Sequence, residues 1–260
     1  MDLREVKERG KRVINRHPWE LARMDIVLDY FNRLKLPSGG GLLDLGCGDP
    51  WFAEQFSAAK PGLSIIAVDI AFEEQQMKEY AEKLSGRKIQ LFRSLEDAER
   101  AVQTPVDVVL LLDVIEHVED DISFLKRLHT SSLITDQTHV IITVPAYQSL
   151  FCSHDTFLGH YRRYTNESLK AHIAEAGYFP VTCTYFFFSL LFPRCIRVVL
   201  ENTGLSKKKT TGLVSWNGSE GLTGFFRSIL WMDYKITQFF FMLGLKFPGL
   251  SNIVVCKRVA

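Results

Sequence analysis

The stretch Leu42-Leu43-Asp44-Leu45-Gly46-Cys47-Gly48-Asp49 decides the fold of this chain. A short apolar run ends in an acid, and two glycines one residue apart follow. A second apolar run, Ile65-Ile66-Ala67-Val68, ends at Asp69. This order predicts a strand, a tight glycine turn, a helix and a second strand, because only glycine lets the backbone approach a ligand closely at such a turn. We therefore expect a nucleoside-containing cofactor across the carboxyl ends of parallel strands, with Asp69 accepting ribose hydroxyls.

The residues around the glycine turn narrow the choice of cofactor. The dinucleotide fingerprint wants a third glycine where Trp51 stands, and an indole there would crowd a pyrophosphate. Asp44, at the end of the first strand, would repel a diphosphate but suits an ammonium group. The expected ligand therefore carries a nucleoside and a positively charged, amino-acid-like end, which fits S-adenosylmethionine and not NAD.

Composition restricts the class of protein. The chain has 260 residues, of which 47% are hydrophobic and 23% charged, as expected of a soluble globular domain with a large core. A formal net charge of +1 gives no general nucleic-acid signature, so no nucleic-acid partner is expected. The five cysteines lie far apart without a CxxC pair, which predicts neither a metal site nor disulfides and favours the reducing cytoplasm. Because the N-terminal stretch is charged and lacks an apolar segment, we expect no signal peptide, and no apolar run reaches the roughly 18 residues of a membrane span.

Strands and helices alternate over the first half of the chain, which predicts a doubly wound α/β fold with a mostly parallel, seven-stranded sheet. The expected strands are residues 42–45, 64–69, 89–92, 106–112 and 140–144. The expected helices are residues 3–15, 18–34, 50–59, 73–84, 95–102 and 119–131. The apolar run 106–112 is typical of a strand buried on both faces.

The regular alternation of expected strands and helices ends after Pro145. We expect a long polar and aromatic loop over 146–165, a helix over 166–176, and strands over 179–185 and 250–259. The residues between those strands are too many for a hairpin loop. The single domain 1–260 therefore divides into four parts. These are N-terminal helices (1–36), a cofactor-binding core (42–185), an aromatic helical insertion (186–249) and a terminal strand (250–260).

Three motifs together resemble the class I S-adenosylmethionine-dependent methyltransferases. They are Asp44-Leu45-Gly46-Cys47-Gly48, Asp69, and Leu112-Asp113-Val114-Ile115-Glu116-His117-Val118. The resemblance covers about residues 15–180 and is strongest to bacterial small-molecule and lipid-linked members, including those of quinone synthesis. The stretch Gly159-His160-Tyr161-Arg162-Arg163-Tyr164-Thr165 is similar to a loop of that group.

The resemblance implies a Rossmann-like methyltransferase fold, S-adenosylmethionine as cofactor, and roles for individual residues. Asp44, Gly46 and Gly48 would line the methionine end, and Asp69 would hold the ribose. Ile70 would pack on adenine, Leu95 would approach the adenine edge, and Asp113 would lie beside the cofactor. Pro50 departs from the family pattern, although proline suits a helix start. The N-terminal helix that carries Trp19 and Arg23 would fold over the cofactor as a lid, with core packing as the alternative for Trp19.

Methyl transfer requires alignment of the acceptor with the methyl group and exclusion of water, and a general base only where the acceptor is protonated. The candidate bases are His154 and His160, on the loop after the fifth strand, and His117, after the fourth. Arg162 and Arg163 would bind a carboxylate or phosphate on the acceptor. Glu116 is expected to cap or steer the helix that begins near Glu119 and to carry no chemistry.

The aromatic insertion, 186–249, has three interpretations. Its two apolar segments form a cap on the sheet, an apolar cavity for a lipid-like or polyprenyl-linked acceptor, or a peripheral membrane contact. Lys207-Lys208-Lys209 between them would attract anionic lipid or serve as a linker. The leading hypothesis is a methyltransferase acting on a small or lipid-linked acceptor. The alternative is a non-catalytic protein that kept the cofactor fold and docks on a membrane or partner. A nucleic-acid methyltransferase ranks third.

Overall fold

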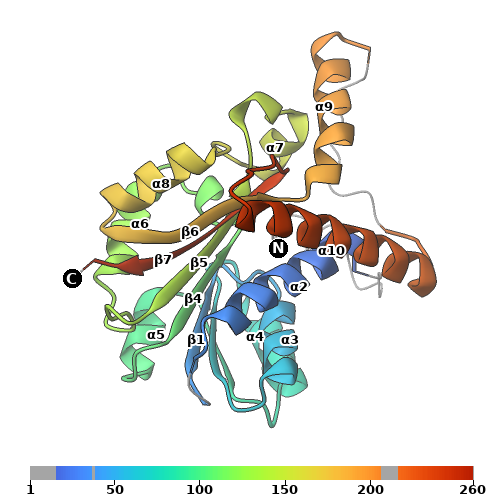
Figure 1. Ribbon diagram of the computed structural model, residues 1–260. Helices are drawn as coiled ribbons and strands as arrows, with labels where there is room; N and C mark the ends of the chain where they lie inside the picture. Colours follow the sequence, from blue (N-terminus) through green and yellow to red (C-terminus); the bar gives the residue numbers. More distant parts are fainter. Residues whose placement is uncertain (1–15, 37–38, 206–215, 260) are drawn as a thin grey trace.

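A seven-stranded sheet with the order β3-β2-β1-β4-β5-β7-β6 forms the centre of the protein (Figure 1). The computed structural model describes residues 16–36, 39–205 and 216–259. The strands are β1 (Gly41–Leu45), β2 (Ser64–Val68), β3 (Ile89–Phe92), β4 (Val108–Leu112), β5 (His139–Pro145), β6 (Tyr178–Phe186) and β7 (Ser251–Arg258). The strands β1 to β5 pair in parallel, whereas β7 runs antiparallel to both β5 and β6. The predicted α/β, mostly parallel seven-stranded sheet is confirmed.

Helices cover both faces of the sheet. They are α2 (Pro18–Arg33), α3 (Trp51–Ala59), α4 (Glu74–Lys83), α5 (Leu95–Ala101), α6 (Asp121–His129), α7 (Ser153–Leu158), α8 (Asn166–Glu175), α9 (Phe188–Asn202) and α10 (Glu220–Met242). Two short 3₁₀ turns, η1 (Ile115–His117) and η2 (Gln148–Leu150), lie between them. The helix expected over residues 3–15 lies outside the described residues.

Alternation along the strands divides the core into two clusters, because successive strand side chains point to opposite faces. On β4, Val108 and Leu110 pack with α2, α3 and α10, whereas Val109 and Leu111 pack with α5, α6 and α8. All of these side chains are buried, as expected of a parallel strand covered by helices on both sides. Because β1, β2 and β4 pair in parallel, their carboxyl ends lie at the same end of the sheet.

The stretch 146–165 differs from its prediction as a continuous loop. It contains η2 and α7, and α7 is stabilised by a reciprocal cap in which the Asp155 side chain accepts from the backbone N–H of Cys152 at 2.9 Å. Gly159, with φ +81°, ends the helix in the left-handed conformation. The prediction failed because α7 has only six residues, too few for a helical apolar pattern.

The insertion 186–249 folds as two helices with different environments. Helix α10 packs along α2, where the Arg227 guanidinium pairs with Asp25 at 2.6 Å and the Lys235 ammonium pairs with Asp29 at 3.0 Å. Helix α9 continues through Pro193 and projects from the body of the molecule (Figure 1). Within the described parts of the chain, no helix combines the length and apolarity needed to cross a membrane.

The glycine turn after β1 depends on close packing as well as backbone freedom. Gly46 has φ +78°, and a Cβ atom there would lie 2.6 Å from Cγ2 of Val114. Its N–H donates to the Val68 carbonyl at 2.8 Å, which ties the turn to the tip of β2. A side chain at this position would therefore be opposed by both conformation and overlap.

We expect Gly46→Ala to lower the free energy of unfolding by about 3 kcal/mol, from left-handed strain plus overpacking. Gly86→Ala is the matched control, because Gly86 also has a positive φ, +82°, but a Cβ there would meet nothing within 4 Å. Its expected cost is about 1 kcal/mol. Urea denaturation of both variants provides the measurement, and equal losses would show that packing against Val114 is unimportant.

Candidate active site

A pocket of about 660 Å³ lies at the carboxyl ends of β1, β2 and β4. Its walls bring together five of the predicted cofactor residues: Gly46, Asp69, Ile70, Leu95 and Asp113. They come from four separate segments, which only the parallel sheet places side by side. The pocket therefore lies where an open α/β sheet binds ligands, outside the carboxyl ends of its strands.

Asp69 and Ile70 fit the two halves of a nucleoside. The carboxylate of Asp69 is buried and accepts the N–H of Gly48 at 2.7 Å and that of Ala71 at 3.0 Å. A carboxylate offers about four acceptor positions, and these bonds fix its orientation at the pocket wall. The Ile70 side chain is 84% exposed on the pocket wall, although it is apolar. A flat aromatic base would cover it.

Asp44 lies on β1 directly before the pocket wall and is almost fully buried. Its Oδ2 atom has no hydrogen-bond partner among the described residues. Burial, together with the nearby carboxylates of Asp69 and Asp49, raises the pKa of Asp44 to about 7. A buried acid left in this state suits a cationic ligand group, which would stabilise its ionised form.

A second pocket, of about 210 Å³, adjoins the first and shares Asp113, His117 and Leu158 with it. Its remaining walls come mainly from α2, α7, α9 and the segment before β7, and they are largely apolar. They include Trp19, Phe187, Leu190 and Leu250. We call the larger cavity the cofactor pocket and the smaller one the acceptor pocket.

Asp113 is held at the junction of the two pockets in a strained conformation. Its φ is +57°, which is uncommon for a residue with a side chain and is a feature of functional sites. Its Oδ1 atom accepts from the Thr143 hydroxyl at 3.0 Å, and its Oδ2 atom pairs with the guanidinium of Arg23. The Arg23 guanidinium also lies 4.9 Å from the Trp19 ring centroid. The N-terminal helix α2 is thus tied to the tip of β4.

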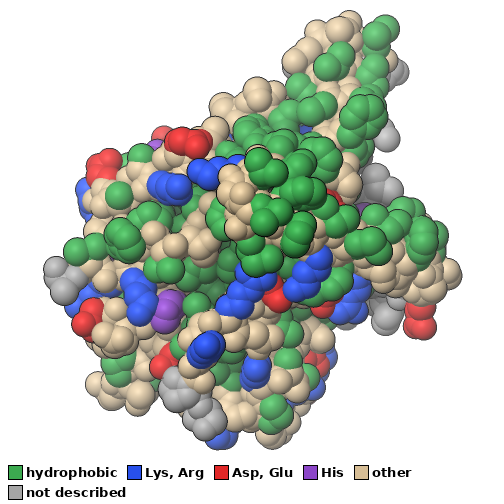
Figure 2. All heavy atoms as spheres, viewed as in Figure 1, with side chains coloured by type: hydrophobic (Ala, Val, Ile, Leu, Met, Phe, Trp, Pro, Cys, Tyr) green, Lys and Arg blue, Asp and Glu red, His purple; other side chains and the backbone are tan. Residues whose placement is uncertain are grey.

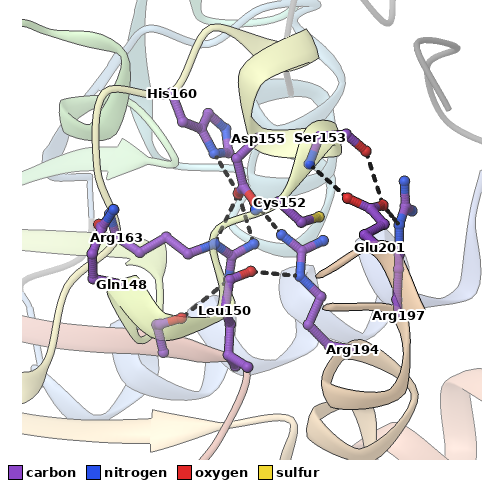
Figure 3. Close-up of polar contacts among 11 residues, drawn as sticks. Gln148, Leu150, Cys152, Ser153, Asp155, His160, Arg163, Arg194, Arg197 and Glu201 are labelled. Carbon is purple, nitrogen blue, oxygen red and sulfur yellow. Dashed lines mark hydrogen bonds and ion pairs between the residues drawn. The ribbon is translucent and has the colours of Figure 1, made fainter. Parts of the chain in front are cut away.

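A buried carboxylate, Asp155, organises the other side of the acceptor pocket (Figure 3). Its Oδ1 atom lies 2.7 Å from Nη2 of Arg163 and 3.0 Å from Nδ1 of His160. Its Oδ2 atom accepts from Cys152 and pairs with Arg194 on α9. Burial opposes ionisation, but the hydrogen bond from His160 and the two guanidiniums hold the pKa of Asp155 far below its usual range.

The three predicted catalytic histidines all line the acceptor pocket, in different electrostatic settings. Burial and the neighbouring Arg194 and Arg197 lower the pKa of His154 to about 4, so its imidazole is neutral at pH 7 and weakly basic. His160 is oriented through Nδ1 by Asp155, and the rings of His117 and His160 meet edge-on with centroids 4.6 Å apart. The structure therefore pairs His117 with His160.

The two arginines predicted to bind substrate lie in different places. Arg163 lines the acceptor pocket, but its guanidinium is engaged by Asp155 and by the Ala146 carbonyl at 3.0 Å. Arg162 is not among the residues that line either pocket, and its guanidinium bonds to Asp121 and to the Glu119 carbonyl.

Glu116 is the site residue that the sequence reasoning missed. It was expected to cap a helix, but Asp120 caps α6 through the N–H of Ser123 at 2.9 Å. Glu116 instead lies in the acceptor pocket with 0% of its surface exposed. No other residue of the described structure donates a hydrogen bond to its carboxylate, and burial, opposed in part by its own backbone N–H, raises its pKa to about 8. The sequence feature that could have identified Glu116 is its position shortly after β4, next to His117.

The fold and the paired pockets define a class I S-adenosylmethionine-dependent methyltransferase domain, as the sequence motifs predicted. The model of a family described as "Methyltransferase domain" matches residues 19–182, and the chain belongs to that family.

Similarity to individual proteins is more distant. The chain is 32% identical over 123 residues to the mitochondrial ubiquinone biosynthesis O-methyltransferase of Schizosaccharomyces pombe, covering 46% of this chain and 43% of that protein. It is 30% identical over 92 residues to the ubiquinone biosynthesis O-methyltransferase of Ruegeria pomeroyi, covering 35% and 36%. The chain thus spans less than half the length of these relatives. A solved S-adenosylmethionine-dependent methyltransferase from Archaeoglobus fulgidus superposes with a TM-score of 0.53 at 20% identity, covering 98% of both chains.

The state of Asp44 predicts a pH-dependent affinity for the cofactor. If its carboxylate faces the ammonium group of S-adenosylhomocysteine, ligand binding lowers its pKa from about 7 and releases a proton. Affinity should then rise up to about tenfold per pH unit below pH 7 and level off above it. Isothermal titration between pH 5.5 and 8, in buffers of different ionisation enthalpy, measures both effects. Asp44→Asn should bind the same ligand without this pH dependence. A flat profile for the unmodified protein would contradict the assignment.

Proposed function

We propose that this protein transfers the methyl group of S-adenosylmethionine to the hydroxyl oxygen of an apolar, lipid-linked acceptor. The observation that carries the proposal is the junction of the two pockets. Asp113 and His117 belong to both, so a methyl group presented from the cofactor pocket would face an acceptor held among apolar walls. The similarity to O-methyltransferases of ubiquinone biosynthesis supports an oxygen acceptor.

The cofactor side of the proposal assigns each predicted residue a role. Asp44, Gly46 and Gly48 would receive the methionine end, and Asp69 the ribose. Ile70 and Leu95 would enclose adenine, because both line the cofactor pocket beside the tip of β2. Asp113 would lie beside the methyl group, since it lines both pockets where they meet.

A hydroxyl acceptor must lose its proton before or during attack on the methyl carbon. The pair of His117 and His160 supports this step. If the Nδ1–H of His160 donates to Asp155, Nε2 becomes an acceptor for a proton in the pocket. His154 is the weaker candidate, because an imidazole with a pKa of about 4 is a poor base at neutral pH.

We expect His160→Asn to lower kcat on a hydroxylated polyprenyl-benzene acceptor about 100-fold, because general-base catalysis contributes factors of this order. His154→Asn should lower kcat much less. S-adenosylhomocysteine affinity should change little in either variant, since neither side chain lines the cofactor pocket. Radiolabelled methyl transfer, with product identification by mass spectrometry, measures both. Methylation confined to amine acceptors would refute the proposal.

Contact of Arg162 and Arg163 with an anionic group on the acceptor remains a prediction. Such a group would compete with Asp155 for Arg163, which favours an acceptor whose reactive end is uncharged.

The surface beside the acceptor pocket supports an acceptor supplied from a membrane. Helix α9 lines the pocket with Leu190 and Arg194, while Phe192, Ile196 and Val199 are exposed on its other side. Exposed apolar side chains also follow α10, among them Phe225, Met232 and Phe239. Figure 2 shows hydrophobic side chains along α9 and over its junction with α10. The occupant we propose is the headgroup boundary of an anionic bilayer, on its cytoplasmic face.

Charge supports this choice of occupant. The sequence that joins the two helices carries Lys207, Lys208 and Lys209, which lie outside the described residues. Three lysines in the sequence between two helices with exposed apolar side chains favour anionic lipid, at about 1 kcal/mol for each charge near the membrane.

Flotation with vesicles of anionic phospholipid tests the membrane contact. The Phe192 side chain is 74% exposed, and Phe192→Ser should lower the partition coefficient about tenfold, the equivalent of roughly 1.4 kcal/mol of lost apolar burial. Phe179→Ser is the matched control, because Phe179 is 63% exposed on β6, away from both helices. Recovery of the unmodified protein entirely in the soluble fraction would refute the contact.

A further inference from the structure

Three potential metal ligands meet where the acceptor pocket adjoins the cofactor pocket. Glu116 and His117 come from η1, and His160 comes from the segment after α7. One ligand atom of each side chain lies within 4.8 Å of those of the other two. We propose that Glu116, His117 and His160 bind a divalent transition-metal ion, with Zn²⁺ as the simplest occupant. This cluster of three residues is called the Glu-His-His cluster below.

The surroundings of the Glu116 carboxylate favour a bound cation. An ionised carboxylate removed from water is strongly destabilising unless it is paired or hydrogen-bonded. The Glu116 side chain is fully buried, and in the part of the chain that the structure describes no other residue donates a hydrogen bond to either oxygen. Arg23 and Arg163 favour its ionised form, but these guanidiniums are engaged by Asp113 and Asp155. A cation bound directly to Glu116 would satisfy its oxygens.

His160 is prepared as a ligand by its second contact. Metal-bound histidines almost always donate their other ring N–H to a carboxylate or carbonyl, which fixes the tautomer and the ring. Nδ1 of His160 lies 3.0 Å from Oδ1 of Asp155. This contact leaves Nε2 for the cluster, and Arg163 and Arg194 keep Asp155 ionised.

The donor set selects the class of metal. Imidazole nitrogen suits zinc, iron, copper and nickel, whereas magnesium and calcium prefer oxygen ligands alone. Three protein ligands leave at least one coordination position open, which is the pattern of a catalytic zinc site. Since the cluster lines the acceptor pocket, the open position would face the acceptor.

A metal here would deepen the proposed function, and this role rests on that function. When the acceptor hydroxyl coordinates the ion, its proton is released to solvent, because a bound cation lowers the pKa of a coordinated oxygen. The oxygen then attacks the methyl carbon. One O–C bond forms, the S–C bond breaks, and its electron pair remains on sulfur, giving S-adenosylhomocysteine. His160 would then act as a ligand, and the ion would replace it as the group that promotes deprotonation.

Metal binding can be tested without the methyl acceptor. Untagged, full-length protein is stripped with a chelator and titrated with Zn²⁺ against a competing chromophoric chelator, and with Co²⁺ monitored by visible absorption. We expect one ion per chain. Glu116→Gln and His160→Asn should each lower Zn²⁺ affinity at least tenfold and remove the Co²⁺ spectrum. His154→Asn, which changes a pocket histidine outside the Glu-His-His cluster, should leave both unchanged.

Thermal unfolding distinguishes a variant that has lost metal binding from one that has failed to fold. Without metal, Glu116→Gln should raise the melting temperature at pH 8 by about 2–4 °C, because it removes a buried carboxylate to which no other described residue donates a hydrogen bond. Zinc should stabilise the unmodified protein and not this variant. Absence of stoichiometric Zn²⁺ and Co²⁺ binding by the unmodified protein would overturn the metal site. Binding without methyl transfer to any hydroxyl acceptor would instead overturn the proposed function and leave the metal site standing.

Discussion

The acceptor side of this protein depends on one buried carboxylate, that of Asp155. An ion removed from water is tolerated only where partners replace its hydration, and here two guanidiniums, an imidazole and a backbone N–H do so. These partners come from α7, α9 and the segment after α7, so one group connects elements that the sheet does not hold together. Removing it would leave Arg163 and Arg194 buried without their counter-ion, and the pocket wall would lose its attachment to the core.

Asp155 and Glu116 are both buried carboxylates, but their surroundings shift their pKa values in opposite directions. Asp155 accepts hydrogen bonds from several residues and stays ionised, whereas no other described residue donates to Glu116, which is driven toward its neutral form. His160 links the two, because its Nδ1 contacts Asp155 and the same ring belongs to the Glu-His-His cluster. A structural network normally satisfies all of its buried members. One carboxylate left unsatisfied next to a satisfied one is better explained by a ligand than by packing.

The sequence predicted the cofactor side of the site far better than the acceptor side. The glycine turn, Asp69 and Asp113 follow strands whose order and parallel pairing are encoded by local apolar runs and turns, so their convergence could be deduced. The acceptor side depends on α7, a short helix held by Asp155 and not by an apolar pattern. Glu116 could not be recognised because its significance lies in what fails to contact it. Arg163, predicted to bind the acceptor, lines the pocket, but its pairing with Asp155 could be seen only in the three-dimensional structure.

Helix α9 relates the pocket to the surface. Its inner side chains, Leu190 and Arg194, belong to the pocket, and its outer side chains, Phe192 and Ile196, remain exposed. An amphipathic helix normally buries its apolar face and exposes its polar one. Here the inner side combines apolar residues such as Leu190 and Val198 with Arg194, which points to a buried carboxylate, while Phe192 is exposed on the outer side. The buried guanidinium is tolerated because Asp155 compensates its charge, so the interaction that shapes the pocket also fixes which side of α9 is exposed.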